Sequence, residues 1–170
     1  KKKWGVLKNI YSRGFNSLSA SSMGRLFDAA ASLILAKYKI SSEAELAMEL
    51  ENIAARPPLD CARGKRGYKV TSYKFGINIR ENEYIINPLS MFKEIIADLK
   101  AKEPQEKIAY RFHLTVAEII RETCLILRKK SKINQIALSG GVFQNTLLLR
   151  LSLDLLYKEG FKVFAHKRLY

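Results

Sequence analysis

Apolar residues recur at helical spacing in several parts of the chain, and each recurrence predicts an amphipathic helix. The first helix is expected over residues 22–38, after a run of turn formers and N-cap candidates at 16–22. A second helix follows it. This helix should end near Ala55, because Pro57 and Pro58 disfavour helix in the residues that precede them.

Two further helices are predicted in the second half of the chain. The first starts at Asn87 and Pro88, which suit an N-cap and a first helical position, and its expected buried face consists of Leu89, Phe92, Ile95, Ile96 and Leu99. The second covers residues 105–130 and carries His113 on an apolar stripe that runs on to Leu127. A lone histidine on such a stripe is most simply a neutral, hydrogen-bonded core residue.

Strand-like patterns occur in two places. Residues 68–87 alternate between apolar and polar positions around a polar turn, which predicts a β-hairpin. A short apolar strand at 133–138 is followed by a leucine-lined helix at 143–158 and a final strand at 161–165. This order predicts a βαβ unit with parallel strands, which places the loop 139–145 at the sheet edge where open α/β sheets bind ligands.

The loop between that strand and that helix suits an anionic ligand. Gly140 and Gly141 have no Cβ, so their backbone can adopt positive φ and approach a phosphate closely. The free N–H groups of the following helix would point at the same place. A nucleotide site is therefore plausible, although glycines in such turns also serve packing alone.

The first helix offers a second group of candidate residues on its polar face. Arg25 and Asp28 lie three positions apart, between the small residues Gly24, Ala31 and Ser32. Small neighbours leave room for a ligand, so this face can line a cleft. The alternative is a solvated ion pair within one helix.

Composition limits the classes of function. The 170 residues suffice for one folded domain, and neither a signal peptide nor an apolar run long enough to span a bilayer is evident, so we expect a cytoplasmic protein without membrane contact. Cys61 and Cys124 lack CxxC spacing, and only His113 and His166 could join them, which argues against a zinc site. The first residue is not methionine, and we expect a piece of a larger protein.

The net charge of +14 attracts polyanions. Its basic residues are scattered over the sequence and do not form one stripe studded with aromatic residues, so nucleic acid is not the expected partner. A basic module that binds RNA or an acidic protein remains the alternative function. A lysine-rich proteome or a missing acidic domain would also explain the imbalance.

Three stretches together resemble the carboxy-terminal part of the hydrogenase maturation carbamoyltransferases, the HypF family. They are Asn16-Ser17 with Ser21-Ser22-Met23-Gly24-Arg25-Leu26-Phe27-Asp28-Ala29-Ala30, then Arg111-Phe112-His113, and Leu138-Ser139-Gly140-Gly141-Val142-Phe143-Gln144-Asn145. The run Glu49-Leu50-Glu51 also fits, and the resemblance covers nearly the whole chain. The tRNA threonylcarbamoyl-adenosine synthases contain a related domain and are an alternative.

The resemblance implies an α/β fold that forms one ribonuclease-H-like lobe of an actin-like ATPase, with nucleotide in the cleft between two lobes. Residues 1–170 would be a single-domain fragment, the second lobe of the carbamoyltransferase domain. Within it, 56–67 would be a linker loop, 68–130 a hairpin with helices, and 133–165 the βαβ unit of the nucleotide site.

The family's activity implies the ligands and partners. Upstream domains make carbamoyl-adenylate from carbamoyl phosphate and ATP, and the domain represented here passes the carbamoyl group to the C-terminal cysteine of a HypE-like acceptor protein, on the route to nickel–iron hydrogenase. The ligands of the expected divalent metal would lie outside this chain. We therefore expect the fragment alone to bind nucleotide weakly and not to catalyse.

The resemblance also implies residue roles for the adenylate site. Gly140 and Gly141, with Ser139 before them, would accommodate the phosphate or ribose region, and Asn145 would hydrogen-bond the nucleotide. Asp28 would accept hydrogen bonds from ribose hydroxyls, and Arg25 would be a phosphate or structural partner. No catalytic residue and no metal ligand is assigned. Two departures from the family pattern are Ala44, where a glycine is usual, and Leu114, where an asparagine is frequent.

Overall fold

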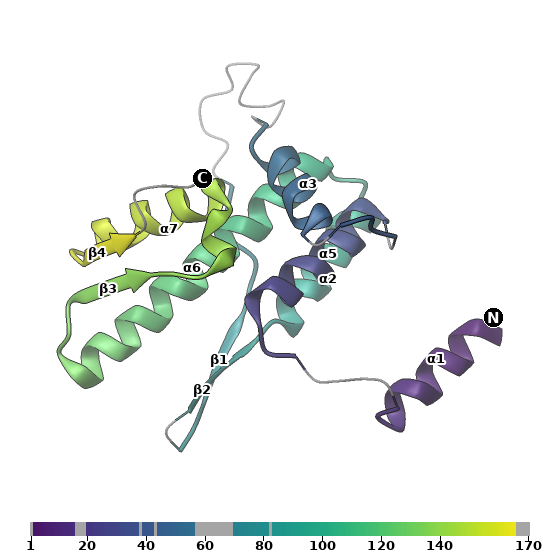
Figure 1. Ribbon diagram of the computed structural model, residues 1–170, viewed down its shortest axis with the longest axis horizontal. Coiled ribbons are helices and arrows are strands. Elements are labelled where there is room, and N and C mark those ends of the chain that lie inside the picture. The colour runs from purple at the N-terminus through teal and green to yellow at the C-terminus, as the bar shows by residue number, and fades with distance from the viewer. Residues whose placement is uncertain are drawn as a thin grey trace.

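The computed structural model describes residues 2–15, 20–37, 39–42, 44–56, 70–81 and 83–165. Several features named above lie outside these residues: the linker loop 56–67 apart from Arg56, the motif residues Asn16 and Ser17, Cys61, and His166. The elements follow in the order α1 (Lys2–Ser12), α2 (Met23–Leu35), α3 (Glu45–Ala54), β1 (Gly76–Arg80), β2 (Glu83–Asn87), α5 (Leu89–Lys100), α6 (Gln105–Ser131), β3 (Gln135–Leu138), the 3-10 helix η1 (Gly141–Gln144), α7 (Thr146–Lys158) and β4 (Lys162–Ala165) (Figure 1).

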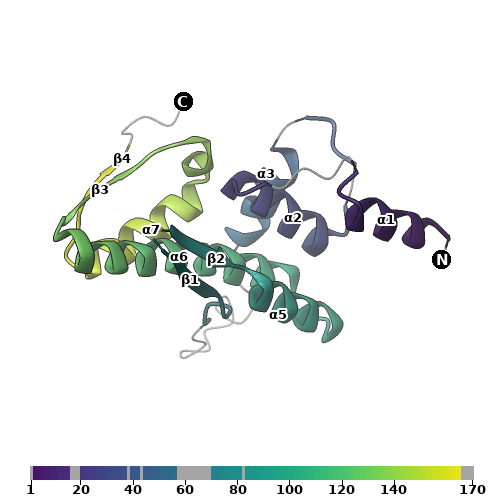
Figure 2. The ribbon, with the colours of Figure 1, turned by 90° about the horizontal axis from the view of Figure 1, so that it is seen from below.

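Helix α6 is the central support of the fold. It crosses the molecule beneath two groups of elements, with α2, α3 and α5 against its first half and α7 with β3 and β4 against its second half (Figures 1 and 2). The first half carries a fully buried apolar stripe made of Ile108, Ala109, Phe112, Val116 and Ala117. The stripe belongs to a core that also contains buried residues of α2, α3, α5 and α7, so one helix surface fixes the positions of four others.

The first predicted helix is confirmed, with a shorter extent. The Ser22 side chain accepts a hydrogen bond from the backbone N–H of Arg25 at 3.3 Å and caps the N-terminus of α2. The helix ends at Leu35, earlier than expected, because Ala36 turns into the left-handed region with φ 54°. Helix α3 ends at Ala54, as the proline pair predicted.

The β-hairpin is confirmed, although its strands are shorter than the predicted span. Strands β1 and β2 pair in antiparallel register, with Ile77 opposite Ile86 and Ile79 opposite Tyr84. The segment before β1 packs on helices and not on a strand. The N–H of Tyr73 donates to the Thr115 hydroxyl on α6 at 2.8 Å, a bond to a helix side chain where a strand would bond to a neighbouring strand.

Tyr73 is the anchor of that segment. Its ring is buried, its hydroxyl donates to Asp98 of α5 at 2.7 Å, and the guanidinium of Arg111 lies 3.9 Å from the ring centroid. Arg111 also pairs with Asp98 and donates to the carbonyl of Thr71. Burial and the neighbouring carboxylate raise the pKa of Tyr73 far above its usual value, so the hydroxyl stays a donor.

Two predicted apolar faces are only partly buried. On α5 the buried residues are Met91 and Ile95, whereas Leu89 and Ile96 are exposed, because the helix presents its i, i+4 pair to α6 and the apolar stripe is wider than that contact. On α6 the predicted stripe ends in an exposed Leu127, since its last turns extend beyond the core. Helix α5 begins one residue later than predicted, with Pro88 as its N-cap and Leu89 as its first residue, although the side chain of Asn87 accepts from the N–H of Leu89 at 3.0 Å.

The βαβ unit is confirmed, with a correction at the start of its helix. Strands β3 and β4 are parallel, with Ile136 opposite Val163. Helix α7 begins at Thr146 and not at Phe143, because Asn145 is its N-cap and the preceding residues form the 3-10 helix η1. The side-chain oxygen of Asn145 accepts from the N–H of Leu148 at 2.7 Å, which starts the helix there.

Helix α1 was not predicted; it stands apart from the body of the molecule in Figure 1 and extends from one end of it in Figure 2. Its aromatic residues Trp4 and Tyr11 are 73% and 80% exposed. Among the helices of the described ranges, none combines the length and the apolar character that crossing a bilayer requires.

Ala44 occupies a backbone conformation that suits glycine better. It precedes α3 with φ 63° and ψ 3°, in the left-handed region, at the position where glycine is usual in the resembling family. A Cβ in this region crowds the following carbonyl oxygen and costs about 1–2 kcal/mol. The chain therefore carries local strain at the start of α3.

We expect Ala44→Gly to stabilise this chain by about 1 kcal/mol, because it removes that strain. Ala29→Gly is the matched control: Ala29 is exposed within α2, where the same exchange costs up to about 1 kcal/mol of helix propensity. Chemical denaturation monitored by circular dichroism measures both. Equal losses of stability in the two variants would contradict the strain at Ala44.

Candidate functional site

A cavity of about 1010 Å³ opens between the two groups of elements that α6 supports. One wall is the N-terminal part of α2 with the side of α3, and the opposite wall is the loop 140–145. Leu138 and Ala165, the last residues of β3 and β4, close one end. The cavity therefore lies at the C-terminal edge of the parallel strands, where the sequence placed it.

Five of the six predicted ligand-binding residues line this cavity. Arg25 and Asp28 reach it from α2, and Gly140, Gly141 and Asn145 reach it from the loop, more than a hundred positions later in the sequence. Ser139, the sixth, precedes the loop residues and does not line the cavity. The structure thus brings two distant parts of the chain together around one space.

The polar face of α2 both lines the cavity and carries an ion pair within the helix, so the two alternatives given for it are both present. Arg25 Nη1 lies 3.1 Å from Asp28 Oδ2, so the ion pair within the helix is present. Both residues also line the cavity, with side chains 70% and 40% exposed. Such an exposed pair stabilises the fold by about 0–1 kcal/mol, and its members remain accessible to a ligand. Ser32 lies elsewhere, since its hydroxyl donates to the Lys37 carbonyl.

The glycine pair divides into two roles. Gly140 has φ 101° and ψ 162°, a conformation that L side chains rarely adopt, so this position requires glycine for the turn. Gly141 is outside the positive-φ region, and a Cβ built on it would meet nothing within 4 Å. Only Gly140 is therefore demanded by the backbone, and Gly141 leaves open space in the cavity wall.

The expectation that the N-terminus of the following helix offers free N–H groups is wrong. Glu51 Oε1 accepts from the Thr146 N–H at 2.7 Å, from the Thr146 hydroxyl at 2.7 Å and from the Leu147 N–H at 3.2 Å. The Asn145 side chain takes the Leu148 N–H. A carboxylate of α3 thus occupies the anion position that the dipole of α7 creates.

Glu51 is therefore a site residue that sequence reasoning did not select. It lines the cavity and joins α3 to α7. The available signal was its place in the Glu49-Leu50-Glu51 run, next to the buried Leu50, which turns its side chain toward the edge of the packed face. Its partner lies 95 positions away, and no local pattern reveals that contact.

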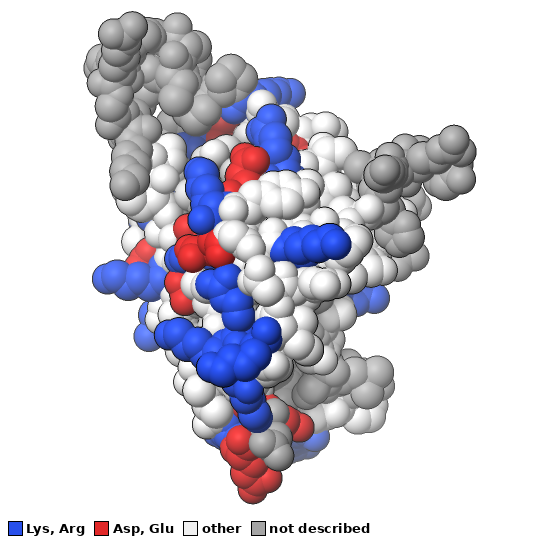
Figure 3. Space-filling view, turned by 90° about the vertical axis from the view of Figure 1, so that its left-hand side faces the viewer, with Lys and Arg blue, Asp and Glu red and all other residues white. Residues whose placement is uncertain are grey.

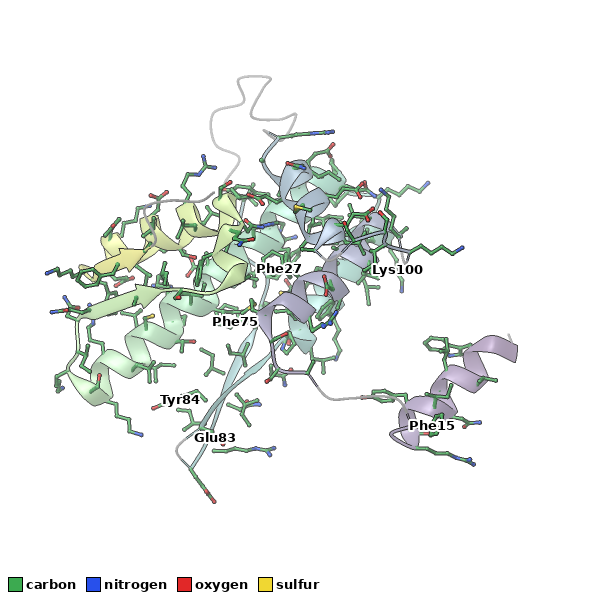
Figure 4. All side chains as sticks on the ribbon, viewed as in Figure 1. Phe15, Phe27, Phe75, Glu83, Tyr84 and Lys100 are labelled. Carbon is green, nitrogen blue, oxygen red and sulfur yellow. The ribbon has the colours of Figure 1, made fainter. Side chains whose placement is uncertain are left out.

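His113 lies directly behind the loop and is fully buried. Its Nδ1 is 2.8 Å from the carbonyl oxygen of Ala109, and its Nε2 is 2.9 Å from Asn145 Nδ2. The rings of Phe27 and Phe112 meet it edge to face, with centroids at 5.3 and 5.8 Å. Phe27, labelled in Figure 4, lies on α2 where that helix faces the loop. The predicted core histidine is confirmed, and it also contacts a cavity residue.

Burial lowers the pKa of His113 below its usual value, against the opposing effects of its bond to the Ala109 carbonyl and the charge of Glu51. The imidazole is therefore neutral at pH 7. A carbonyl oxygen only accepts, so the single ring proton lies on Nδ1, and Nε2 is an acceptor for the Asn145 amide.

The described residues contain no group of three or more His, Cys, Asp or Glu side chains that could hold a metal ion. Cys124 is half-buried on α6, and burial raises the pKa of its thiol, so it stays protonated at neutral pH. The charged side chains that line the cavity are Arg25, Asp28 and Glu51, and its polar side chains are Ser22, Gln144 and Asn145.

Comparison with known proteins identifies the family. The model of "Carbamoyltransferase, Kae1-like Domain, second subdomain" matches residues 1–170. The chain is 29% identical to the carbamoyltransferase HypF of Rhodobacter capsulatus over 160 residues, 91% of this chain and 18% of the relative. It is also 29% identical to the HypF of Synechocystis sp. over 155 residues, again 91% and 18%.

Solved structures agree in fold. A crystal structure of full-length HypF in the phosphate- and nucleotide-bound form matches with a TM-score of 0.83 at 30% identity, over 98% of this chain and 24% of that one. The HypF of T. kodakarensis matches with a TM-score of 0.74 at 28% identity, over 98% and 20%. The mixed α/β architecture thus agrees with the predicted lobe of an actin-like fold.

The chain spans about a fifth of the length of the curated relatives that it matches. Within that span the family model covers every residue, and two of the motifs that carried the resemblance, those at 22–28 and 138–145, contribute residues to one cavity. The chain belongs to the HypF carbamoyltransferase family, in which it corresponds to the second subdomain of the Kae1-like domain.

Proposed function

We propose that this chain is the nucleotide-binding lobe of a carbamoyltransferase that passes a carbamoyl group from carbamoyl-adenylate to the C-terminal cysteine of a HypE-like acceptor protein, in hydrogenase maturation. Upstream domains would make the adenylate from carbamoyl phosphate and ATP. The chain would supply one side of the nucleotide cleft and would be inactive alone.

One observation supports this proposal above all: a single cavity gathers Arg25 and Asp28 of one helix with the glycine loop at the end of β3. These are the residues that the family resemblance marks for adenylate binding. A relative of this chain has been crystallised in a phosphate- and nucleotide-bound form. A volume of about 1010 Å³ also accommodates a ligand of nucleotide size.

In the proposed transfer, the acceptor thiolate attacks the carbamoyl carbon. A carbon–sulfur bond forms, the bond from the carbamoyl carbon to the phosphate oxygen breaks, and AMP leaves with that oxygen. The role of this chain is to hold the adenylate so that the carbamoyl carbon stays in line with the thiolate. This step needs no proton transfer from the described residues. Any divalent metal would be held by ligands outside this chain.

The proposed contacts must take into account that Glu51 already occupies the N-terminus of α7 beside the cavity. Because Glu51 holds the first N–H groups of α7, the phosphate would lie against the backbone at Gly140 and Gly141 and not on the dipole of α7. Asp28 would exchange Arg25 for ribose hydroxyls, at low cost because the exposed pair contributes little stability. Arg25 would then be released toward the phosphate.

A basic module that binds RNA or an acidic protein is the second candidate. Lys and Arg side chains gather over the end of the molecule where α6 finishes (Figure 3), and the exposed Lys129, Lys130 and Lys132 belong to that end. The cavity itself has a different character, since it presents the carboxylates of Asp28 and Glu51 beside Arg25. A polyanion would therefore bind on the outer surface and leave the cavity free.

We expect Asp28→Ala, in the full-length protein that contains this chain, to weaken AMP binding by about ten-fold, the effect of about 1.4 kcal/mol from lost hydrogen bonds to the ribose. The fold should not change, because only an exposed ion pair is removed. Isothermal titration calorimetry measures the affinity. Glu49→Ala is the matched control, since it removes another exposed pair, with Lys37, that lies outside the cavity. AMP affinity reduced equally in both variants would rule out the assignment of Asp28.

The glycine pair gives a second prediction. Gly141→Ala should leave thermal stability unchanged, because its Cβ enters open space, yet weaken AMP binding by filling the place of close backbone approach. Gly140→Ala should lower the stability by about 1–3 kcal/mol, because its backbone combines positive φ with an extended ψ that only glycine adopts readily. Thermal melts and calorimetry separate the two effects. Unchanged AMP affinity in Gly141→Ala would place the phosphate elsewhere.

Salt distinguishes the two candidate functions. We expect AMP affinity to change by less than about three-fold between 50 and 200 mM salt, since few ions are released. A surface that neutralises many RNA phosphates should lose about 10³–10⁵ in affinity over the same interval. Titrations of AMP and of a single-stranded RNA oligonucleotide make the comparison. Tight RNA binding with that steep dependence, together with no AMP binding, would favour the basic module.

A further inference from the structure

The amide of Asn145 is held at both of its ends. Its Oδ1 accepts from the Leu148 N–H at 2.7 Å, and its Nδ2 lies 2.9 Å from His113 Nε2. These two contacts require opposite groups, because a backbone N–H needs an acceptor and an unprotonated ring nitrogen needs a donor. The orientation of the amide is therefore fixed by its surroundings, and rotating it by 180° would break both bonds at once.

His113 is itself fixed as an acceptor. The Ala109 carbonyl at 2.8 Å holds the ring proton on Nδ1, and the buried site disfavours a second proton on the ring. Phe27 of α2 and Phe112 of α6 pack against the ring edge to face, which favours this ring orientation. A chain of contacts thus runs from the backbone of α6 through the imidazole to the cavity wall.

The charged groups near these contacts do not replace the hydrogen bonds of His113. Glu51 of α3 acts on the ring through its charge, but its oxygen is engaged by Thr146 and Leu147 at the start of α7. On the α2 side, Arg25 and Asp28 pair with each other. Asn145 is therefore the polar side chain through which His113 acts on the cavity.

We propose that His113 is a positioning residue for the nucleotide: by accepting one N–H of Asn145, it directs the second N–H of that amide into the cavity, toward a ribose or phosphate oxygen. The inference rests on the proposed function, because it takes an adenine nucleotide as the ligand. It adds that Asn145 acts as a donor. Without the acceptor behind it, the amide would keep its capping bond but lose the direction of its free N–H.

Two substitutions separate positioning from packing. In His113→Gln, the side-chain oxygen can take the place of Nε2, so the contact with Asn145 is kept while the bond to Ala109 is lost. In His113→Asn, the shorter amide can replace Nδ1 and keep the bond to Ala109, but it does not reach Asn145. Both variants are polar and smaller than histidine, and thermal melts of each measure how much the change costs the core.

The test is AMP binding by the full-length protein that contains this chain, measured by calorimetry for the parent, the two His113 variants and Asp28→Ala, with thermal melts of each. We expect the AMP affinity of His113→Gln to stay within about three-fold of that of the parent. His113→Asn should bind AMP about ten-fold more weakly, which corresponds to the loss of about one hydrogen bond. If both His113 variants bind alike, or if His113→Asn binds more tightly, positioning by His113 is wrong.

The Asp28→Ala variant keeps the two levels of the argument separate. A loss of AMP affinity in Asp28→Ala with equal affinities in the two His113 variants overturns the positioning role alone. A parent protein that does not bind AMP overturns the proposed function and this inference together. If one His113 variant fails to fold, the same comparison is made with Asn145→Ser, which can still cap α7 but has no amide to donate; parent-like AMP binding by this variant would overturn the inference.

Discussion

The burial of one stripe of α6 is the constraint on which the rest of the structure depends. The same helix surface holds α2 and α3 on one side and α7 on the other, so the width of the cavity between them is set by residues that do not line it. Ala109 and Ala117 have small side chains, so the neighbouring helices can pack close to α6 at these positions. His113 lies on the same stripe, which is why a core residue also reaches the cavity wall.

The start of α7 shows how the fold satisfies its own polar groups before any ligand binds. Its first N–H groups are taken by Glu51 and by the cap residue Asn145. Each buried donor needs a partner, and a carboxylate at a helix N-terminus also gains from the dipole. The contact ties α3 to the βαβ unit. It therefore stabilises the cavity walls and at the same time removes the anion site that the sequence pattern indicates.

Local patterns predicted the local parts of this structure well. The hairpin, the βαβ order, the end of α3 at the proline pair and the cavity at the strand ends all follow from periodicity and turn chemistry over short windows. Local pattern also singled out Arg25, Asp28 and the glycine loop, the resemblance to a known family assigned them to one site, and the structure brings these segments together. What remained hidden was contact over long sequence separation. Glu51 meets Thr146 across 95 positions, and Tyr73 meets Thr115 across 42, and neither contact leaves a periodic trace.

The ends of the helices and the widths of their buried faces were also predicted inaccurately, and both errors have the same cause. A stripe of apolar residues states which side of a helix can be buried, while the neighbour decides how much of it is covered. Ile96 and Leu127 continue their stripes and stay exposed because no element of the described chain packs over them. The 3-10 helix η1 ends and helix α7 begins at Asn145, because the side chain of Asn145 caps α7 through one hydrogen bond. The apolar residues Val142 and Phe143 had suggested that α7 begins earlier.

The two walls of the cavity differ in how firmly they are held, and this difference bears on ligand binding. On the loop side, Asn145 is fixed by His113 and Leu148, so ordering it for a ligand costs little. On the α2 side, Arg25 and Asp28 are joined by one exposed ion pair, which a ligand can replace at a cost of about 0–1 kcal/mol. A nucleotide would thus find one wall preorganised and the other able to exchange partners. Under the proposed function, that combination would let the cleft bind the adenylate in a defined orientation and still release the product, because the exchangeable pair could form again when AMP leaves.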